Sequence, residues 1–321
     1  MGVPVALAAA GAAAGVAKAT AEMWAKLNTA RTCLLEVTNK TDHVLRVVSH
    51  AHPHGGFAVP PSQEIPARTV DLYGSQSKGG SVMTGTEGSV TYRIGDLDTR
   101  MTIGWNNPFV GGNECTGRLD GEQRFAFHFD RVCGSGDKAH MKYELRPVDM
   151  RGHAVYGAIL EKWALLRYSA GPLGYPVTSE AGLSDGAGRF TNFERGTIYW
   201  HPRIGTAYAV WGLIGARWAQ LGRERFGYPV TDELPTPDGV GRYNHFRKFI
   251  NGAPHDASIY WTQATGAHEV YGAIRARWAA LGWERSHLRY PVSAEVDFQG
   301  GRLQRFQSGA LFWNGREVSV R

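Results

Sequence analysis

Hydrophobic and polar positions change their spacing along the 321-residue chain. Residues 3–17 carry no charge, and Lys18, Glu22 and Lys26 then follow at intervals of four, as on one face of a helix. Between residues 31 and 150, short β-branched segments alternate with a period of two, which indicates strands. After residue 153, one pattern is written three times. The spacing therefore predicts a helix, a strand-rich domain and a repeat domain.

The first segment predicts one helix from about Val5 to Asn28, about 35 Å long. A secretory signal should begin with basic residues, which are missing here. A permanent transmembrane anchor is disfavoured because Ala and Gly are only weakly apolar. A third interpretation is a mobile helix lying on a protein or membrane surface, with Met23, Trp24 and Leu27 on its apolar face. The three interpretations stay open, beside a helix that is simply docked on its own domain.

Seven segments predict the strands of the second region: 33–39, 43–49, 67–74, 88–96, 99–106, 124–130 and 141–147. Their length and spacing are typical of an antiparallel β-sandwich and not of βαβ units. We therefore expect an α+β chain of two domains, with the helix in residues 1–30 and the sandwich in residues 31–147.

A long stretch resembles the actinoporins, a family of pore-forming cytolysins. It runs through Tyr-Gly-Ser-Gln at 73–76, Gly-Ser-Val-Met-Thr-Gly at 80–85, Gly-Ser-Val-Thr-Tyr at 88–92 and Met-Thr-Ile-Gly-Trp-Asn-Asn-Pro-Phe at 101–109. The resemblance covers about residues 3–146. It implies a sandwich that docks on a membrane and releases its helix to line an oligomeric pore. The same fold also resembles that of fungal fruit-body lectins, which bind sugars and make no pores.

The resemblance implies two sets of residues. The implied headgroup site consists of Tyr92, Trp105, Asn106, Pro108 and Phe109, and the implied pore helix of Val5, Ala9, Ala13, Val16, Met23, Trp24 and Leu27. The Tyr- and Trp-rich run that forms a choline cage in the family is replaced here by Val110-Gly-Gly-Asn-Glu. Choline specificity is therefore not implied.

Three repeats occupy residues 153–205, 206–266 and 267–315. Each contains a helix-like segment (154–163, 209–218, 269–278), a Tyr-Pro turn (173–178, 226–231, 288–293), a Gly-Arg pair and a closing aromatic segment (198–200, 259–261, 311–313). The pattern predicts helix–turn–strand units packed side by side around a shared core. Trp163, Trp218 and Trp278 fall on the periodic apolar face and are expected in that core.

These units resemble the LGFP repeat, whose turn appears here as Leu-Gly-Tyr-Pro, Phe-Gly-Tyr-Pro and Leu-Arg-Tyr-Pro. In the third turn, either Arg289 adopts a backbone conformation that Gly normally takes, or the repeat is a distorted end cap. The resemblance implies attachment to cell-wall or other surface glycans. The candidate glycan-binding residues are the turn tyrosines and the Gly-Arg arginines: Tyr175, Arg189, Tyr228, Arg242, Tyr290 and Arg302.

Charge and cysteine content narrow the function classes. The net charge of +6 lies wholly in residues 151–321, which also hold eight of the ten Trp, but no basic run or nucleic-acid motif is present. Nucleic acid is therefore not an expected partner. Cys33, Cys115 and Cys133 have no metal-ligand spacing, and at most Cys115 and Cys133 pair.

Catalytic and metal motifs are missing from the sequence. We found no nucleophile elbow, zinc-protease motif, Walker loop or dinucleotide fingerprint. The His-x-His-Pro-His run at 50–54 is expected to be a polar loop without a metal. The sequence thus predicts a secreted, non-enzymatic, cofactor-free and metal-free cytolysin that binds membranes, self-associates into pores and carries a glycan-targeting domain. The alternative is a two-domain lectin that forms no pore.

Overall fold

The computed structural model describes residues 3–6, 12–78 and 83–321. The chain forms two compact units, Met1–Asp149 and Met150–Arg321, each described by itself below. Among the described residues, no helix is both long and apolar enough to cross a membrane.

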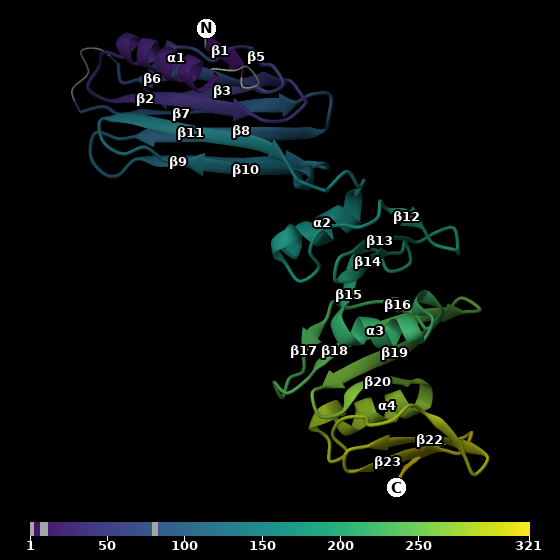
Figure 1. Ribbon diagram of the computed structural model, residues 1–321. Helices are drawn as coiled ribbons and strands as arrows, with labels where there is room; N and C mark the ends of the chain where they lie inside the picture. Colours follow the sequence, from purple (N-terminus) through teal and green to yellow (C-terminus); the bar gives the residue numbers. More distant parts are fainter. Residues whose placement is uncertain (1–2, 7–11, 79–82) are drawn as a thin grey trace. The chain divides into compact units, whose positions relative to one another are not determined.

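The first unit is a sandwich of two sheets (Figure 1). One sheet has the order β1 (Val3–Ala6), β6 (Thr69–Gln76), β2 (Thr32–Asn39), β11 (Lys138–Pro147), β10 (Phe127–Val132), and β4 (Gly56–Val59) also pairs with β6. The other has the order β5 (Glu64–Ile65), β3 (Leu45–His54), β7 (Thr86–Ile94), β8 (Thr99–Asn107), β9 (Glu114–Gly121). A short 3₁₀ helix, η1 (Arg124–Ala126), precedes β10. All seven predicted strands are present, and pairing is antiparallel except between β2 and β11.

The sandwich core follows from the alternation of side chains along each strand. On β7, Val90, Tyr92 and Ile94 point inward, while the residues between them face outward. On β8, Met101, Ile103 and Trp105 do the same, and all six side chains belong to one buried cluster.

Helix α1 (Ala12–Lys26) packs on a second, smaller apolar cluster. Ala19, Met23 and Leu27 are buried there together with the strand residues Leu34, Val59, Val70 and Leu72. Val16 and Trp24 are partly buried, and Ala13 is exposed. The periodic apolar face is therefore occupied by the chain's own sheet.

The prediction of one helix from Val5 to Asn28 is wrong at its start. Val3–Ala6 form β1, in which Val5 pairs with Val70 on the edge of β6. Pro4 has no amide hydrogen to donate, and such a residue is tolerated in an edge strand. Ala9, expected in the helix, lies outside the described residues.

The second unit contains three helices, α2 (Gly157–Leu165), α3 (Gly212–Gln220) and α4 (Gly272–Leu281), each packed on an antiparallel sheet (Figure 1). The first sheet is β12 (Ala181–Gly182), β13 (Arg189–Phe193), β14 (Gly196–Trp200), β15 (Ala207–Trp211). The second is β16 (Tyr228–Pro229), β18 (Arg242–Ile250), β19 (Ala253–Thr262), β20 (Gly266–Tyr271), with β17 (Leu234–Pro235) also on β18. The third is β21 (Val296–Phe298), β22 (Gly301–Phe306), β23 (Gly309–Trp313), β24 (Val318–Val320). Short 3₁₀ helices η2 (Tyr168–Ala170), η3 (Arg223–Arg225) and η4 (Trp283–Arg285) follow the three helices.

The second and third repeats each supply a strand to the sheet of the repeat before them. The motif Ala-Val-Trp of the second repeat ends β15, which completes the first sheet, and Glu-Val-Tyr of the third repeat ends β20, which completes the second. β24 fills the same place in the last sheet. The corresponding segment of the first repeat, residues 154–156, is not a strand. The sheets therefore cross the boundaries predicted at residues 206 and 267.

The repeated tryptophans are core residues, as the sequence predicts. The indole Nε1 of Trp163, Trp218 and Trp278 donates to the carbonyl oxygen of Gly174, Gly227 and Arg289 respectively, at 3.0–3.1 Å. Arg289 has a φ of 59°, so it does adopt the left-handed conformation that glycine takes at that place in the first repeat.

Candidate functional sites

Exposed apolar side chains gather where the loop after β8 meets the loop before β7. Met83, Phe109 and Val110, here called the apolar tip, are exposed by 64%, 38% and 77%. All three line one hollow of about 390 Å³, together with Asn106 and Pro108. His54 and Glu87 also line this hollow, so the three apolar side chains form a small apolar patch beside polar ones, an arrangement found at binding surfaces.

Arg31 holds the tip loop to the start of β2. Its Nη2 donates to the carbonyl oxygen of Phe109 at 2.6 Å, and its guanidinium lies 5.2 Å from the centre of the Phe109 ring. It also forms an ion pair with Asp137. Nearby, the buried amide of Asn107 donates to the carbonyl oxygens of Thr32 and Asp137, at 3.0 and 2.9 Å. These hydrogen bonds therefore hold the loop of the apolar tip to the body of the sandwich.

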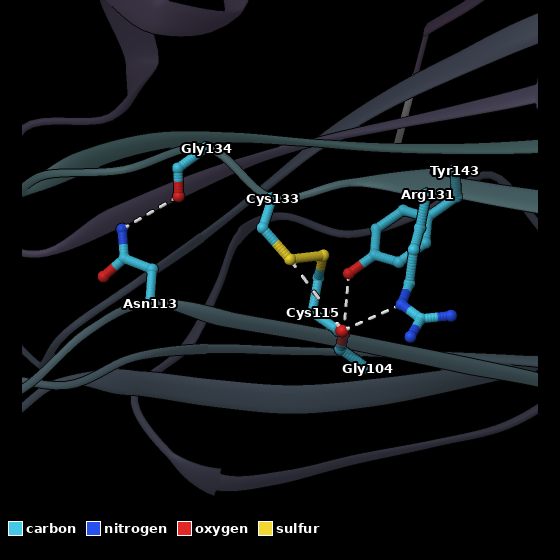
Figure 2. Close-up of a disulfide and its surroundings, with 7 residues drawn as sticks. All are labelled: Gly104, Asn113, Cys115, Arg131, Cys133, Gly134 and Tyr143. Carbon is cyan, nitrogen blue, oxygen red and sulfur yellow. Dashed lines mark hydrogen bonds between the residues drawn. A yellow bond between two sulfur atoms is a disulfide. The ribbon is translucent and has the colours of Figure 1, made fainter.

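A disulfide joins the two sheets beside the same loop (Figure 2). Cys115 lies on β9 and Cys133 follows β10, so the bond ties the open edges of the two sheets together. Asn113 donates to the carbonyl oxygens of Gly134 and Gly136, at 3.1 and 2.8 Å. Cys33 is free and buried, and burial raises the pKa of its thiol to about 12.

Tyr92 and Trp105 do not belong to a surface headgroup site, which corrects the expectation from the resemblance. Both point into the sandwich and are exposed by 0% and 2%. The Tyr92 hydroxyl donates to the Tyr73 hydroxyl at 3.0 Å, and burial raises the pKa of Tyr92. Trp105 lies across Gly88, where a Cβ would come within 2.5 Å of the indole ring. Of the five expected residues, Asn106, Pro108 and Phe109 remain at the surface hollow.

The histidine run is strand and not loop, contrary to expectation. Residues 50–54 lie in β3. The centre of the His52 ring lies 4.1 Å from the centre of the Phe57 ring and 5.4 Å from the centre of the Trp105 ring. Over the part of the chain that the structure describes, no group of side chains is arranged to hold a metal ion.

Two of the candidate glycan-binding tyrosines instead join neighbouring repeats. The Tyr228 hydroxyl donates to Asp185 in the preceding repeat, and the Tyr290 hydroxyl donates to Asp238 at 2.6 Å. Both tyrosines are buried, so they are not available to a sugar. Tyr175 belongs to the first repeat and has no earlier repeat to meet. Its ring lies 3.7 Å from the guanidinium carbon of Arg151.

The three candidate arginines share one arrangement, here called the Glu–Arg–Trp cluster. Each pairs with a glutamate of its own repeat and lies directly across the sheet from a partly exposed tryptophan. The clusters are Glu180–Arg189–Trp200, Glu233–Arg242–Trp261 and Glu295–Arg302–Trp313. The three tryptophans end the segments quoted above, but the glutamates were missed. An aligned comparison of Thr-Ser-Glu, Thr-Asp-Glu and Ser-Ala-Glu after each Tyr-Pro turn could have found them.

In the first repeat the cluster opens into a hollow of about 270 Å³. Tyr156, which is largely exposed, forms another wall, and its backbone N–H donates to Glu180 at 3.2 Å. Two aromatic rings beside a carboxylate and a guanidinium can stack on a sugar ring and bind its hydroxyls.

Comparison with known proteins gives one family match. Residues 173–225 and 226–286 match the LGFP repeat. Among solved structures, the chain is similar to the lipid-binding protein Nakanori, with 15% identity, a TM-score of 0.38, and coverage of 42% of this chain and 80% of that chain. A search of the curated proteins found no match. The resemblance of residues 3–146 to actinoporins stays a sequence-based prediction.

Proposed function

We propose that this chain is a secreted, non-enzymatic protein that attaches to membranes through the apolar tip of its sandwich. The observation that carries the proposal is the gathering of Met83, Phe109 and Val110 around one hollow. The disulfide between Cys115 and Cys133 supports secretion, because such bonds persist in oxidising compartments.

The expected attachment is reversible. Transfer of a large apolar side chain out of water contributes about 1.5–3 kcal/mol, and Phe109 is already partly covered. Three such side chains give an affinity comparable to a single short acyl chain, which is a marginal anchor. A second attachment through the repeat unit would therefore strengthen binding through effective concentration.

Vesicle co-sedimentation tests the tip directly. We expect the Met83→Asp/Val110→Asp double variant to lose at least about tenfold in vesicle affinity, because each carboxylate would enter the interface. Val48→Asp, which changes an exposed valine on β3 away from the hollow, is the matched control and should bind normally. Equal vesicle binding by the wild type, the double variant and the control would refute membrane attachment through the apolar tip.

The finer proposal is pore formation by α1. The described helix has 15 residues and so spans about 22 Å, less than a hydrocarbon core of about 30 Å. A pore would therefore need a helix longer than the described one, and β1 would have to leave β6. Release would also uncover Leu34, Val70 and Leu72, which lie beneath the helix.

Dye release from liposomes tests this step. The full chain should release dye after self-association, and a variant lacking residues 1–28 should bind vesicles without release. Far-UV circular dichroism of the truncated protein shows whether its sandwich is folded, because the apolar side chains that the deletion uncovers (Leu34, Val70 and Leu72) would themselves favour vesicle binding. Equal release by both proteins would remove the helix from the mechanism, and no release from any lipid mixture would reject the pore.

A second candidate function is glycan binding by the repeat unit, which the hollow beside Trp200 favours. We expect Tyr156→Ala and Trp200→Ala to reduce binding on glycan arrays and purified cell walls. Leu213→Ala, on the exposed face of α3, serves as the control. Glycan binding without any vesicle binding would identify the chain as a two-domain lectin.

A further inference from the structure

A second, larger cleft lies between the second and third repeats and contains none of the residues discussed as glycan-binding candidates. It has a volume of about 620 Å³, within the range typical of small-molecule sites. Its walls are the end of α3 and η3, the hairpin β18–β19, the end of β20 and the first turn of α4.

The cleft owes its size to a long hairpin in the second repeat. Phe193 and Ile198 are five residues apart in the first repeat, whereas their counterparts Phe246 and Ile259 are thirteen apart. The corresponding hollow between the first and second repeats is only about 180 Å³. The added hairpin residues bring Lys248, Ile250 and His255 to the cleft wall.

The cleft wall carries three positively charged side chains. Arg225 and Lys248 are exposed at the rim, and Arg275 is partly buried deeper in the wall. The Arg275 Nε donates to Ser258 Oγ at 2.7 Å, and its guanidinium lies 5.0 Å from the centre of the Trp283 ring. These contacts fix the guanidinium, and burial lowers its pKa. A bound anion would offset the cost of that burial.

Each of the two carboxylates in the wall is paired with an arginine outside it, and Asp256 also interacts electrostatically with Arg275 of the same wall. Glu269 accepts from Arg217 Nε and Nη2 at 2.7 and 2.9 Å, and Asp256 accepts from Arg247 at 2.7 and 3.2 Å. Each carboxylate keeps lone pairs that can accept ligand hydroxyls. A hydroxyl-rich ligand with one negative charge can meet the wall's cations and these acceptors together, whereas a ligand with several negative charges would also have to place charge beside Asp256 and Glu269.

Two aromatic rings supply a surface for a sugar ring. Phe226 and Tyr271 meet edge to face, with ring centres 6.4 Å apart, on the wall of the same cleft. We propose that this cleft binds a saccharide that carries one carboxylate, with the acid group at Arg225, Lys248 and Arg275 and the ring against Phe226 and Tyr271. The inference rests on the proposed glycan binding of the repeat unit and names its ligand class.

Calorimetric titration of the full chain tests the inference with a uronic-acid disaccharide, its methyl ester and a sugar phosphate. We expect the acid to bind about tenfold more tightly than the ester, and the phosphate to bind more weakly than the acid. Arg225→Gln/Lys248→Gln should weaken binding of the acid by about tenfold and leave binding of the ester unchanged. The control Arg277→Gln/Arg316→Gln removes the same charge from exposed positions outside the cleft and should have no effect.

The outcomes separate this inference from the proposed function. Equal affinity for acid and ester, tighter binding of the phosphate, or an equal loss in both double variants would overturn the acidic-saccharide site. If no acidic saccharide binds while neutral glycans still bind the repeat unit, only this inference fails. If no glycan of any kind binds, the glycan function of the repeats fails with it.

Discussion

Several strand pairs of the sandwich join segments that lie far apart in the chain, whereas most strand pairs of the repeat unit join consecutive strands. β2 and β11 run parallel although about a hundred residues separate them, and the open edges of β9 and β10 are tied by a disulfide. In the repeat unit, each of the first two sheets is instead completed by a strand of the next repeat, and a tyrosine of that repeat donates to an aspartate of the one before.

The difference explains where each unit can carry a site. The repeats are linked through their cores, so the side chains around their hollows recur at fixed positions, and a local insertion enlarges one cleft without disturbing the others. The sandwich has one shared core, so its variable surface is confined to loops at strand ends. The apolar tip is one such place.

The largest expected effect tests whether the two units are independent. Trp278→Ala removes a buried indole and its hydrogen bond to Arg289, and should destabilise the repeat unit by about 3–5 kcal/mol. The sandwich should unfold at its normal urea concentration. Urea unfolding followed by tryptophan fluorescence and far-UV circular dichroism measures both transitions, and a shift of both together would show one cooperative unit.

Removal of the disulfide should lower the stability of the sandwich and not that of the repeat unit. The bond closes a loop with a sequence separation of 18, which corresponds to about 3 kcal/mol of loop entropy. Cys115→Ser/Cys133→Ser should lower the free energy of unfolding of the sandwich by about that amount and leave the repeat unit unchanged. Urea unfolding of the oxidised and reduced wild type provides the control, since only the first unit should respond to reduction.

Acidification should stabilise the sandwich through Asp71. This carboxyl is fully buried, and burial raises its pKa from 3.8 to about 6, although Ser62 donates to it from its backbone N–H and hydroxyl. The folded state therefore binds the proton more tightly than the unfolded state. The stabilisation is complete below about pH 4 and is lost as the pH rises through 6, a change of about 2–3 kcal/mol.

Urea unfolding of the sandwich at several pH values measures this dependence. Asp71→Asn should flatten the profile between pH 4 and pH 7. An unchanged profile in that variant would assign the titration to another group.

The smallest expected effect concerns the links between repeats. Tyr228→Phe deletes the hydroxyl that donates to Asp185 and should cost about 1–2 kcal/mol. Tyr175→Phe changes the equivalent tyrosine of the first repeat, which meets no earlier repeat, and should cost less than about 0.5 kcal/mol. Thermal or urea unfolding of the repeat unit compares the two, and equal losses would mean that the inter-repeat bond adds nothing.

Sequence patterns predicted the repeat unit well because its information is local. The three buried tryptophans follow from the period alone, and the structure decides between the two alternatives that the sequence left open for the third turn, in favour of a left-handed Arg289. The pairing of β15 and β20 with the sheet of the preceding repeat could not be predicted from the sequence. Ala-Val-Tyr and Ala-Val-Trp have the same pattern whether or not a sheet lies beside them. The first copy lacks such a neighbour and is not a strand.

Site residues of the sandwich were harder to predict, because alternation alone does not show which face of a strand lies inside. Trp105 has the aromatic character of a headgroup ligand, but it shares the inward face of Ile103 and Met101. Val110 was missed, although an apolar residue before Gly111-Gly112 in a turn is a signal that could have been used. The apolar tip and the clefts depend on which loops lie close together in the fold. The pattern of a single sequence does not show such contacts between distant segments.

One measurement tests membrane attachment through the tip most directly. A polarity-sensitive fluorophore is placed on Val110→Cys of the full chain; of the native cysteines, Cys33 is buried and Cys115 and Cys133 are bonded, so the label is selective. On vesicles, the emission should shift to the blue and be quenched by lipid-chain quenchers, while the same label on Val48→Cys stays unchanged. Vesicle binding without any response at position 110, or with an equal response at both positions, would contradict the account.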